Sequence, residues 1–220
     1  YLDFYIWPKY AEKGYVWMIP KCDGRANVGL VTEDKSRTKK GLDEFIANTH
    51  FKDLEQVAPP WKIKGNPAFG GTIPISGPHE NTYADGLMLV GDAAGFTSPL
   101  FEGGSHLALK SAVFAAQIAS KSISAGDITS SSLAEYQSLW KNEFPPYSKI
   151  LSGKSALFDL SDDDMSLMAR CFPDEMSNMG PHGKLAVCFK ILFLRPSLYA
   201  RKIIPAMLSF GYSRAKYYGW

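Results

Sequence analysis

The chain has 220 residues, of which 45% are hydrophobic, 13% aromatic and 21% charged. This composition is typical of a globular protein with a sizeable apolar core and excludes a disordered or fibrous chain. The 24 lysines and arginines nearly balance the 22 aspartates and glutamates, so the sequence has no basic footprint for nucleic acid. The three cysteines and four histidines lack metal-site spacing, and no apolar run is long enough to cross a bilayer. We therefore expect neither a nucleic-acid partner nor a bound metal.

The first third of the sequence predicts a β-meander followed by one helix. Short runs rich in aromatic and β-branched residues are separated by turns that contain Gly14 and Gly24. A Pro- and Gly-rich passage at 57–78 then interrupts regular structure. In chain order, we expect strands at 1–7, 15–19 and 26–31, a helix at 38–48, and one further strand around Ile73 and Ile75.

A strand, a turn and a helix are expected in the middle of the chain. The apolar run at 86–90 predicts a buried strand, and the small residues at 91–95 predict a turn. Gly103 and Gly104 then precede a predicted helix at 105–122. This order of elements is typical of α/β folds.

The first turn of this segment has the composition of a ligand site. The carboxylate of Asp92 can accept hydrogen bonds from sugar-like hydroxyls, while Ala93, Ala94 and Gly95 are small enough to let backbone N–H groups approach an anion. The second turn, at 99–104, ends in paired glycines that also allow close backbone approach. Two such turns in succession indicate one extended cofactor that contains a polyol or a phosphate.

The last third of the sequence is predicted to be helical. Ser161 is a typical N-cap residue, and three aspartates follow it in the first turn, where the helix dipole favours negative charge. After Glu175 the sequence contains no acidic residue, while basic and aromatic residues are frequent. A helix is expected at 130–141, with a continuation to residue 158 that two prolines interrupt. Further helices are expected after residue 161 and in two amphipathic stretches at the end of the chain.

Several segments resemble one group of flavoproteins. Residues 83–95, Tyr-Ala-Asp-Gly-Leu-Met-Leu-Val-Gly-Asp-Ala-Ala-Gly, and 99–104, Pro-Leu-Phe-Glu-Gly-Gly, resemble the C-terminal flavin motif of FAD-dependent reductases and hydroxylases. Residues 14–29, Gly-Tyr-Val-Trp-Met-Ile-Pro-Lys-Cys-Asp-Gly-Arg-Ala-Asn-Val-Gly, are similar to a segment of the geranylgeranyl reductase family within that group. This family includes the archaeal digeranylgeranylglycerophospholipid reductases. Residues 70–78 are also similar to the family, and the resemblance extends over about residues 1–125.

The resemblance implies an α/β chain that forms the C-terminal part of a para-hydroxybenzoate-hydroxylase-like FAD fold. It implies an antiparallel sheet of a substrate-binding domain at 1–80, a strand–turn–helix segment of the FAD-binding domain at 81–125, and a helical domain at 126–220. The N-terminal GxGxxG turn that binds the ADP part of FAD is absent from the sequence. The chain is therefore expected to be part of a longer flavoprotein, with about half of a flavin site and no activity alone.

The resemblance also implies which residues contact FAD and the substrate. In the family, the aspartate that matches Asp92 holds the ribityl chain, and the helix after Gly104 points at the pyrimidine edge of the flavin. Tyr15 and Trp17 share one face of their strand by alternation, where they line a prenyl channel or belong to an ordinary core. No catalytic side chain is assigned, because the flavin supplies the hydride. The implied FAD contacts are Gly91, Asp92, Ala93, Gly95, Pro99, Gly103 and Gly104, and the implied substrate contacts are Tyr15, Trp17, Pro20 and Lys21.

The function implied by the resemblance is FAD-dependent reduction of isoprenoid double bonds in a prenyl lipid, by a cytoplasmic enzyme. The electron donor, NAD(P)H or ferredoxin, stays open. A flavin-dependent monooxygenase or halogenase of the same fold and a non-catalytic lipid-binding remnant are the alternatives. The basic, aromatic stretch at 184–220 predicts either peripheral docking on an anionic membrane or a helical cap that faces solvent. Cys171 and Cys188 either form a disulfide or remain thiols.

Overall fold

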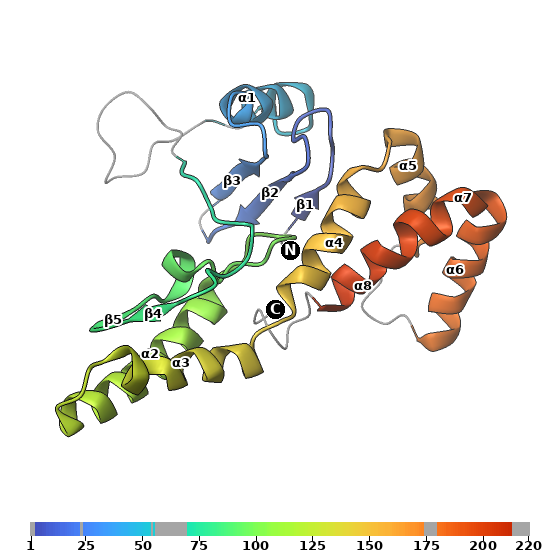
Figure 1. Ribbon diagram of the computed structural model, residues 1–220. Coiled ribbons are helices and arrows are strands. Elements are labelled where there is room, and N and C mark those ends of the chain that lie inside the picture. The colour runs from blue at the N-terminus through green and yellow to red at the C-terminus, as the bar shows by residue number, and fades with distance from the viewer. Residues whose placement is uncertain (1–2, 23, 54, 56–69, 174–179, 213–220) are drawn as a thin grey trace. The chain divides into compact units, whose positions relative to one another are not determined.

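The computed structural model describes residues 3–22, 24–53, 55, 70–173 and 180–212 (Figure 1). It divides into two compact units, of which the first contains Tyr1–Gly71 and Phe158–Gly180 and the second contains Thr72–Leu157 and Pro181–Trp220. The division into three domains that the sequence suggests stays a prediction.

The first unit contains the predicted meander. Strands β1 (Asp3–Tyr5), β2 (Tyr15–Pro20) and β3 (Ala26–Val31) form an antiparallel sheet in chain order. Strand β1 is shorter than expected, because the carbonyl oxygen of Trp7 accepts the backbone N–H groups of Tyr10 and Ala11 in a turn. Residues 1 and 2 of that predicted strand lie outside the described residues.

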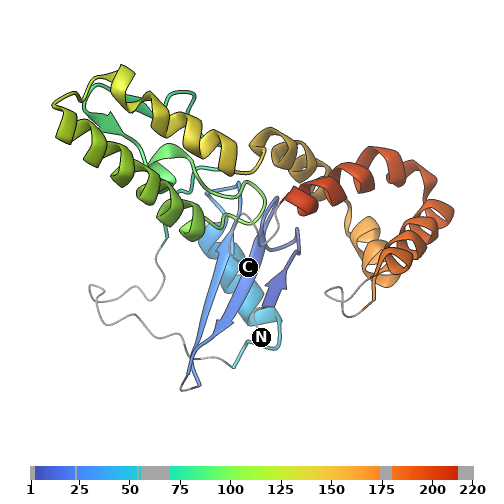
Figure 2. The same ribbon diagram turned by 90° about the horizontal axis from the view of Figure 1, so that it is seen from below.

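Helix α1 (Thr38–Asn48) covers one face of this sheet, at the predicted position (Figure 2). Phe45 of this helix is fully buried and packs 5.2 Å from the ring of Tyr5 and 5.6 Å from the ring of Tyr10. The apolar cluster between helix and sheet also includes Val16 and Leu30. Alternation along β2 therefore points Val16 towards α1 and its neighbours Tyr15 and Trp17 to the opposite face.

Helix α5 (Asp162–Cys171) belongs to the same unit and begins as the sequence predicts. The Ser161 hydroxyl oxygen accepts the backbone N–H of Asp164 at 3.2 Å. This contact is the expected N-cap, and the aspartates of the first turn add negative charge at the positive end of the helix dipole.

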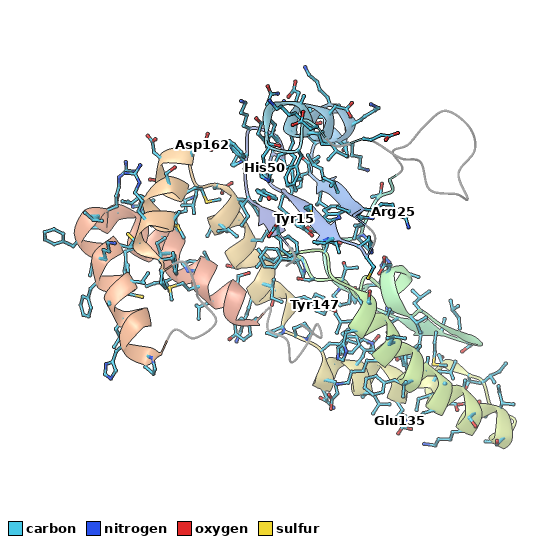
Figure 3. All side chains as sticks on the ribbon, turned by 180° about the vertical axis from the view of Figure 1, so that it is seen from behind. Tyr15, Arg25, His50, Glu135, Tyr147 and Asp162 are labelled. Carbon is cyan, nitrogen blue, oxygen red and sulfur yellow. The ribbon has the colours of Figure 1, made fainter. Side chains whose placement is uncertain are left out.

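The second unit contains the predicted strand–turn–helix segment. It comprises the hairpin strands β4 (Tyr83–Ala84) and β5 (Leu87–Met88), the 3-10 helix η1 (Gly91–Ala94), and helices α2 (Ser105–Ala125) and α3 (Ser130–Glu143). Helices α2 and α3 lie side by side as a helical hairpin (Figure 2). Lys121 of α2 pairs with Glu135 of α3 at 2.6 Å, and Figure 3 labels Glu135 on that helix.

Two expectations for strands in this unit are wrong. The strand expected to be buried at 86–90 is reduced to Leu87 and Met88, and Leu87 is 51% exposed. It pairs with β4 alone among the described residues, so no second strand covers its other edge. The strand expected around Ile73 and Ile75 does not form, because Pro74 has no backbone N–H for a ladder. Its carbonyl oxygen instead accepts the Thr97 hydroxyl.

The remaining described helices of the second unit follow α3 and, further along the chain, α5. They are α4 (Tyr147–Phe158), α6 (Pro181–Leu194), α7 (Pro196–Leu198), the π-helical turn η2 (Tyr199–Ile203) and α8 (Ile204–Tyr212). Prolines at 145 and 146 separate α3 from α4, as predicted. None of the helices in the described ranges combines the length and apolar character that a bilayer crossing requires.

Candidate cofactor and substrate sites

The turn around Asp92 is held by backbone hydrogen bonds within η1. The N–H groups of Gly95 and Phe96 donate to the carbonyl oxygens of Asp92 and Gly91, at 2.9 and 3.1 Å. The N–H of Gly91 donates to the Ser111 hydroxyl of α2 at 3.1 Å. These bonds fix the turn on α2, and they occupy the N–H groups of Gly91 and Gly95.

Gly95 makes the tight bend after this turn possible. Its φ is +79°, a left-handed conformation that favours glycine, and a Cβ atom there would lie 2.4 Å from the carbonyl oxygen of Gly77. Gly95 is also buried, so it shapes the backbone beside a ligand site and does not itself contact a ligand.

The exposed part of the turn consists of Asp92 and Ala93. The carboxylate of Asp92 lies next to Gly104, since a Cβ atom at Gly104 would stand 3.0 Å from Asp92 Oδ1. Gly104 is the N-cap of α2, and it has no side chain to fill the space. The two predicted turns therefore meet, with one acidic side chain at the start of one helix.

The second turn is built around Ser98, which is fully buried. Its N–H donates to the carbonyl oxygen of Gly103 at 2.8 Å, and its own carbonyl oxygen accepts the N–H of Glu102 at 2.9 Å. The Ser98 hydroxyl also accepts the N–H of Leu100 at 3.3 Å. Pro99 is buried, so it shapes the turn and leaves Gly103 and Gly104 partly exposed.

The start of α2 is suited to an anionic or electron-rich group. The N–H of Ala108 donates to the Gly104 carbonyl oxygen at 2.8 Å, and the N–H groups of the turn before it precede the helical hydrogen-bond ladder. Such N–H groups and the helix dipole attract negative charge. A ligand here would meet the Asp92 carboxylate on one side and these N–H groups on the other.

The helical hairpin supports the strand that leads to Asp92. The Tyr136 hydroxyl donates to the carbonyl oxygen of Leu89 at 2.6 Å. Burial of this side chain raises the pKa of Tyr136 to about 12, so it stays protonated as a donor. Trp140 Nε1 donates to the Thr82 hydroxyl at 2.8 Å, which ties the same helix to the beginning of the β-hairpin.

Of the seven predicted FAD contacts, four reach the surface and three do not. Asp92, Ala93, Gly103 and Gly104 are exposed or partly exposed beside the start of α2, whereas Gly91, Gly95 and Pro99 are buried and determine the backbone. That these residues bind FAD stays a prediction. Sequence reasoning missed Ser98, which closes the second turn through four hydrogen bonds with backbone groups and which no periodic pattern distinguishes.

An aromatic row occupies the face of the first-unit sheet that α1 does not cover. The rings of Tyr15 and Trp17 lie 6.1 Å apart on β2, and the ring of Phe4 on β1 lies 5.2 Å from Tyr15 (Figure 3 labels Tyr15). Phe4 is the direct cross-strand partner of Trp17. Sequence reasoning missed Phe4, because its membership of this face follows from the register between two strands.

Trp17 is held flat against β3. Gly29 is its cross-strand partner, and a Cβ atom at Gly29 would lie 2.0 Å from the indole atom Cζ2. The indole Nε1 donates to the Asn27 side-chain oxygen at 2.9 Å. The row is largely apolar, but its members differ in exposure: Phe4 is 40% exposed and Trp17 is partly exposed, whereas Tyr15 is buried beneath the surface at 5%.

The other two predicted substrate contacts do not join this row. Pro20 alternates with Ile19, so it lies on the opposite face of β2 from Tyr15 and Trp17. Lys21 is exposed at the hairpin turn, where its N–H donates to the carbonyl oxygen of Arg25 at 2.8 Å. Their contact with a substrate stays a prediction.

The described residues contain no group of three or more His, Cys, Asp or Glu side chains that could hold a metal ion. Cys22, Cys171 and Cys188 are free thiols.

Comparison with known proteins identifies the family. Residues 1–59, which include the whole three-stranded sheet and α1, match the model of the geranylgeranyl reductase catalytic domain. The chain is 38% identical over 180 residues to a digeranylgeranylglycerophospholipid reductase of Methanocaldococcus jannaschii, covering 81% of this chain. The chain belongs to the geranylgeranyl reductase family. A second relative, digeranylgeranylglycerophospholipid reductase 2 of Methanothermobacter thermautotrophicus, is 34% identical over 174 residues.

A solved structure of the same family type agrees with this membership. The geranylgeranyl bacteriochlorophyll reductase-like protein of Thermoplasma acidophilum matches 90% of the chain with a TM-score of 0.70 and 27% identity. The chain spans 49% of that structure, and 44% and 42% of the two reductases from M. jannaschii and M. thermautotrophicus. It therefore corresponds to about half the length of its relatives.

Proposed function

We propose that the complete protein containing this chain is an FAD-dependent reductase that saturates isoprenoid double bonds of a prenyl lipid. The observation that carries the proposal is the cradle formed by Asp92 and Gly104, in a chain similar to reductases whose names specify geranylgeranyl lipids. A Cβ atom at Gly104 would crowd the Asp92 carboxylate, so the space beside the start of α2 suits a ligand with hydroxyls and a polar ring edge.

Each part of this cradle has a role in the proposed reaction. Asp92 would accept hydrogen bonds from the ribityl hydroxyls, and Ala93 and Gly103 would let the ligand approach the backbone. The start of α2 would stabilise negative charge on the pyrimidine edge of the ring. When bound, reduced FAD would supply a hydride and a proton for saturation of an alkene and would be left as oxidised FAD.

Phe4 and Trp17, the exposed and partly exposed members of the aromatic row, form the proposed surface for the prenyl chain, and buried Tyr15 supports them from below. Aromatic side chains bind an isoprenoid by apolar contact, and they exclude water from the double bond without any charged group. We assign no catalytic side chain in this chain. In the proposal, the aromatic row positions the prenyl chain and excludes water from its double bond, and the cradle binds the cofactor.

The test is an anaerobic turnover experiment with the complete protein. The flavin is reduced with dithionite, and a geranylgeranylated lipid is added in the absence of oxygen. We expect the flavin to reoxidise while the lipid gains two hydrogen atoms for each bond reduced, as measured by mass spectrometry. A bound flavin that reoxidises with oxygen alone would instead favour a monooxygenase or halogenase. A protein without flavin would favour a non-catalytic lipid-binding role.

We further propose that the second unit meets its lipid at an anionic membrane surface through α6. Leu185, Phe189, Leu192 and Phe193 recur at helical spacing on this helix and are exposed, with Phe193 at 87%. The opposite side of α6, with Val187 and Ile191, is buried. The residues from 181 to 220 contain basic but no acidic side chains, which complements an anionic surface. Residues 213–220 of the predicted basic stretch lie outside the described residues.

A vesicle sedimentation assay tests this membrane contact. We expect the protein to sediment with vesicles that contain phosphatidylglycerol and to remain in solution with phosphatidylcholine vesicles. Replacement of Phe189 and Phe193 by serine should abolish sedimentation. Serine at Leu109 and Ile123, which are comparably exposed on α2, is the control and should leave sedimentation unchanged.

A further inference from the structure

A buried ion pair joins the second turn of the candidate flavin site to α4. Lys154 Nζ lies 3.5 Å from Glu102 Oε1, and the two side chains are 7% and 5% exposed. Other ion pairs in the unit, such as Lys110 with Glu143, are far more exposed. Lys154 is the one charged residue in the described part of the chain that is buried as a whole.

The backbone of Glu102 adopts a conformation that needs support from its surroundings. Its φ is +52°, a left-handed conformation that is unfavourable for a residue with a side chain. The N–H of Glu102 donates to the Ser98 carbonyl oxygen, and the next two residues are Gly103 and Gly104 at the start of α2. A charge removed from water needs a partner of opposite charge, so the Lys154 ammonium holds the Glu102 side chain inward and compensates for the strain.

Lys154 comes from a helix that is itself held in place. The Ser209 hydroxyl of α8 donates to the Ile150 carbonyl oxygen of α4 at 2.8 Å, in a buried contact. Lys149 Nζ lies 5.3 Å from the centre of the Tyr212 ring of α8. Helix α4 is thus a fixed support from which the ammonium group reaches the turn.

We propose that Glu102 and Lys154 are positioning residues that hold the turn at 98–104 in the shape that presents the start of α2 to the flavin. This inference rests on the proposed function for the identity of the ligand. It assigns to the C-terminal helices a role in the cofactor site that is separate from any lipid contact. Neither residue touches the cofactor, because both side chains are buried between the turn and α4.

The first measurement is hydrogen exchange of the turn in the complete protein without added flavin. We expect Glu102→Gln and Lys154→Met each to accelerate exchange of the backbone amides at 98–105 by about tenfold or more, because removing either charge weakens the buried contact that holds the turn. Amides of the α2–α3 hairpin should keep their protection. Equal acceleration throughout the second unit would overturn the proposal, since it would indicate general destabilisation.

The second measurement is flavin binding by the same variants. We expect FAD affinity to fall by about tenfold in each single variant, and the double variant to lose less than the sum of the two, because both substitutions remove the same contact. The exposed pair provides the control, Glu143→Gln, which should change neither quantity. Unchanged turn exchange together with unchanged affinity in Glu102→Gln would refute the inference.

Two further outcomes separate this inference from the proposed function. If the single variants do not fold, Lys154→Arg keeps the positive charge and should retain protection of the turn, whereas loss of protection in that variant would contradict the ion pair. If the unaltered protein binds no FAD, the proposed cofactor is wrong. Amide hydrogen exchange at 98–105 then still decides whether the Glu102–Lys154 pair positions the turn.

Discussion

The carboxylate of Asp92 lies against Gly104, with no side chain between the first predicted turn and the start of α2. A Cβ atom at Gly104 would stand 3.0 Å from Asp92 Oδ1 and 3.1 Å from Thr97 Cγ2. The two residues come from different turns, and the missing side chain lets these turns share one surface. The charge of Asp92 and the smallness of Gly104 can therefore be tested separately.

Replacement of Asp92 by asparagine tests the charge. The variant keeps the shape of the side chain and loses the charge-assisted hydrogen bonds to ligand hydroxyls, so we expect FAD affinity to fall by about tenfold to a hundredfold. Flavin fluorescence titration of the complete protein measures this. Asp43→Asn on α1, where Asp43 pairs with Lys39 at the surface, is the control. Unchanged affinity in Asp92→Asn would remove Asp92 from the site.

Replacement of Gly104 by alanine tests whether the open space beside the Asp92 carboxylate is needed for FAD binding. The new methyl group must displace either the Asp92 carboxylate or the Thr97 side chain, so we expect FAD affinity to fall by about tenfold. Gly71→Ala, where the added methyl meets no atom within 4 Å, should bind FAD normally. Equal affinities in the two variants would show that the cradle does not accommodate the ligand.

Replacement of Gly95 by alanine tests the bend after η1. Alanine at this position must adopt an unfavourable left-handed backbone conformation, and its methyl group clashes with the Gly77 carbonyl oxygen. We therefore expect the unfolding free energy to fall by about 2–3 kcal/mol. Gly126→Ala separates the two effects, because Gly126 has a φ of +69° and open space around it. Thermal denaturation should show a larger decrease in Tm for Gly95→Ala, and equal decreases would exclude the clash.

Replacement of Trp17 by leucine tests the aromatic row. We expect KM for the prenyl lipid to rise several-fold while FAD content stays the same, because the substitution removes the indole surface and leaves Asp92 and Gly104 of the cradle unaltered. Steady-state reduction assays with a flavin absorbance measurement check both quantities. Trp7→Leu, outside the strand, is the matched control. A parallel loss of FAD would indicate a folding defect and not a substrate contact.

Asp85 predicts a pH dependence of stability. Its carboxylate accepts the Ser130 N–H at the start of α3 at 2.6 Å, and this hydrogen bond holds the pKa of Asp85 below its usual value. A folded-state pKa below the unfolded value stabilises the protein above the unfolded pKa, and the contribution is lost as pH falls through the folded pKa. Asp85→Asn should thus lower the urea midpoint at pH 7 more than at pH 3. A constant difference between these pH values would show that Asp85 does not titrate with folding.

Local patterns in the sequence predicted much of the fold. Strand β3, helix α1 and the Ser161 cap lie where apolar periodicity and capping residues place them, since each signal lies within one turn or strand. The start of α2 at Ser105 likewise follows the paired glycines. The relation of Tyr15 to Trp17 needed nothing beyond strand alternation.

Contacts between distant segments escaped prediction. Phe4 joins the aromatic row through cross-strand register, and Ser98 closes its turn through backbone bonds that have no sequence pattern. The strand at 86–90 reads as buried from its composition, but Leu87 is exposed because the described residues provide a single partner strand. Composition reports the tendency of a segment to be buried and not the presence of the segment that buries it.

The sequence by itself determined the order of strands and helices and the position of Asp92 before a helix, because hydrogen bonding and side-chain periodicity act over a few neighbouring residues. The tertiary structure alone decided which predicted residues reach the surface and that Glu102 meets Lys154. These relationships depend on packing between segments far apart in the chain, where burial makes an ion pair necessary and a missing Cβ atom makes a close approach possible.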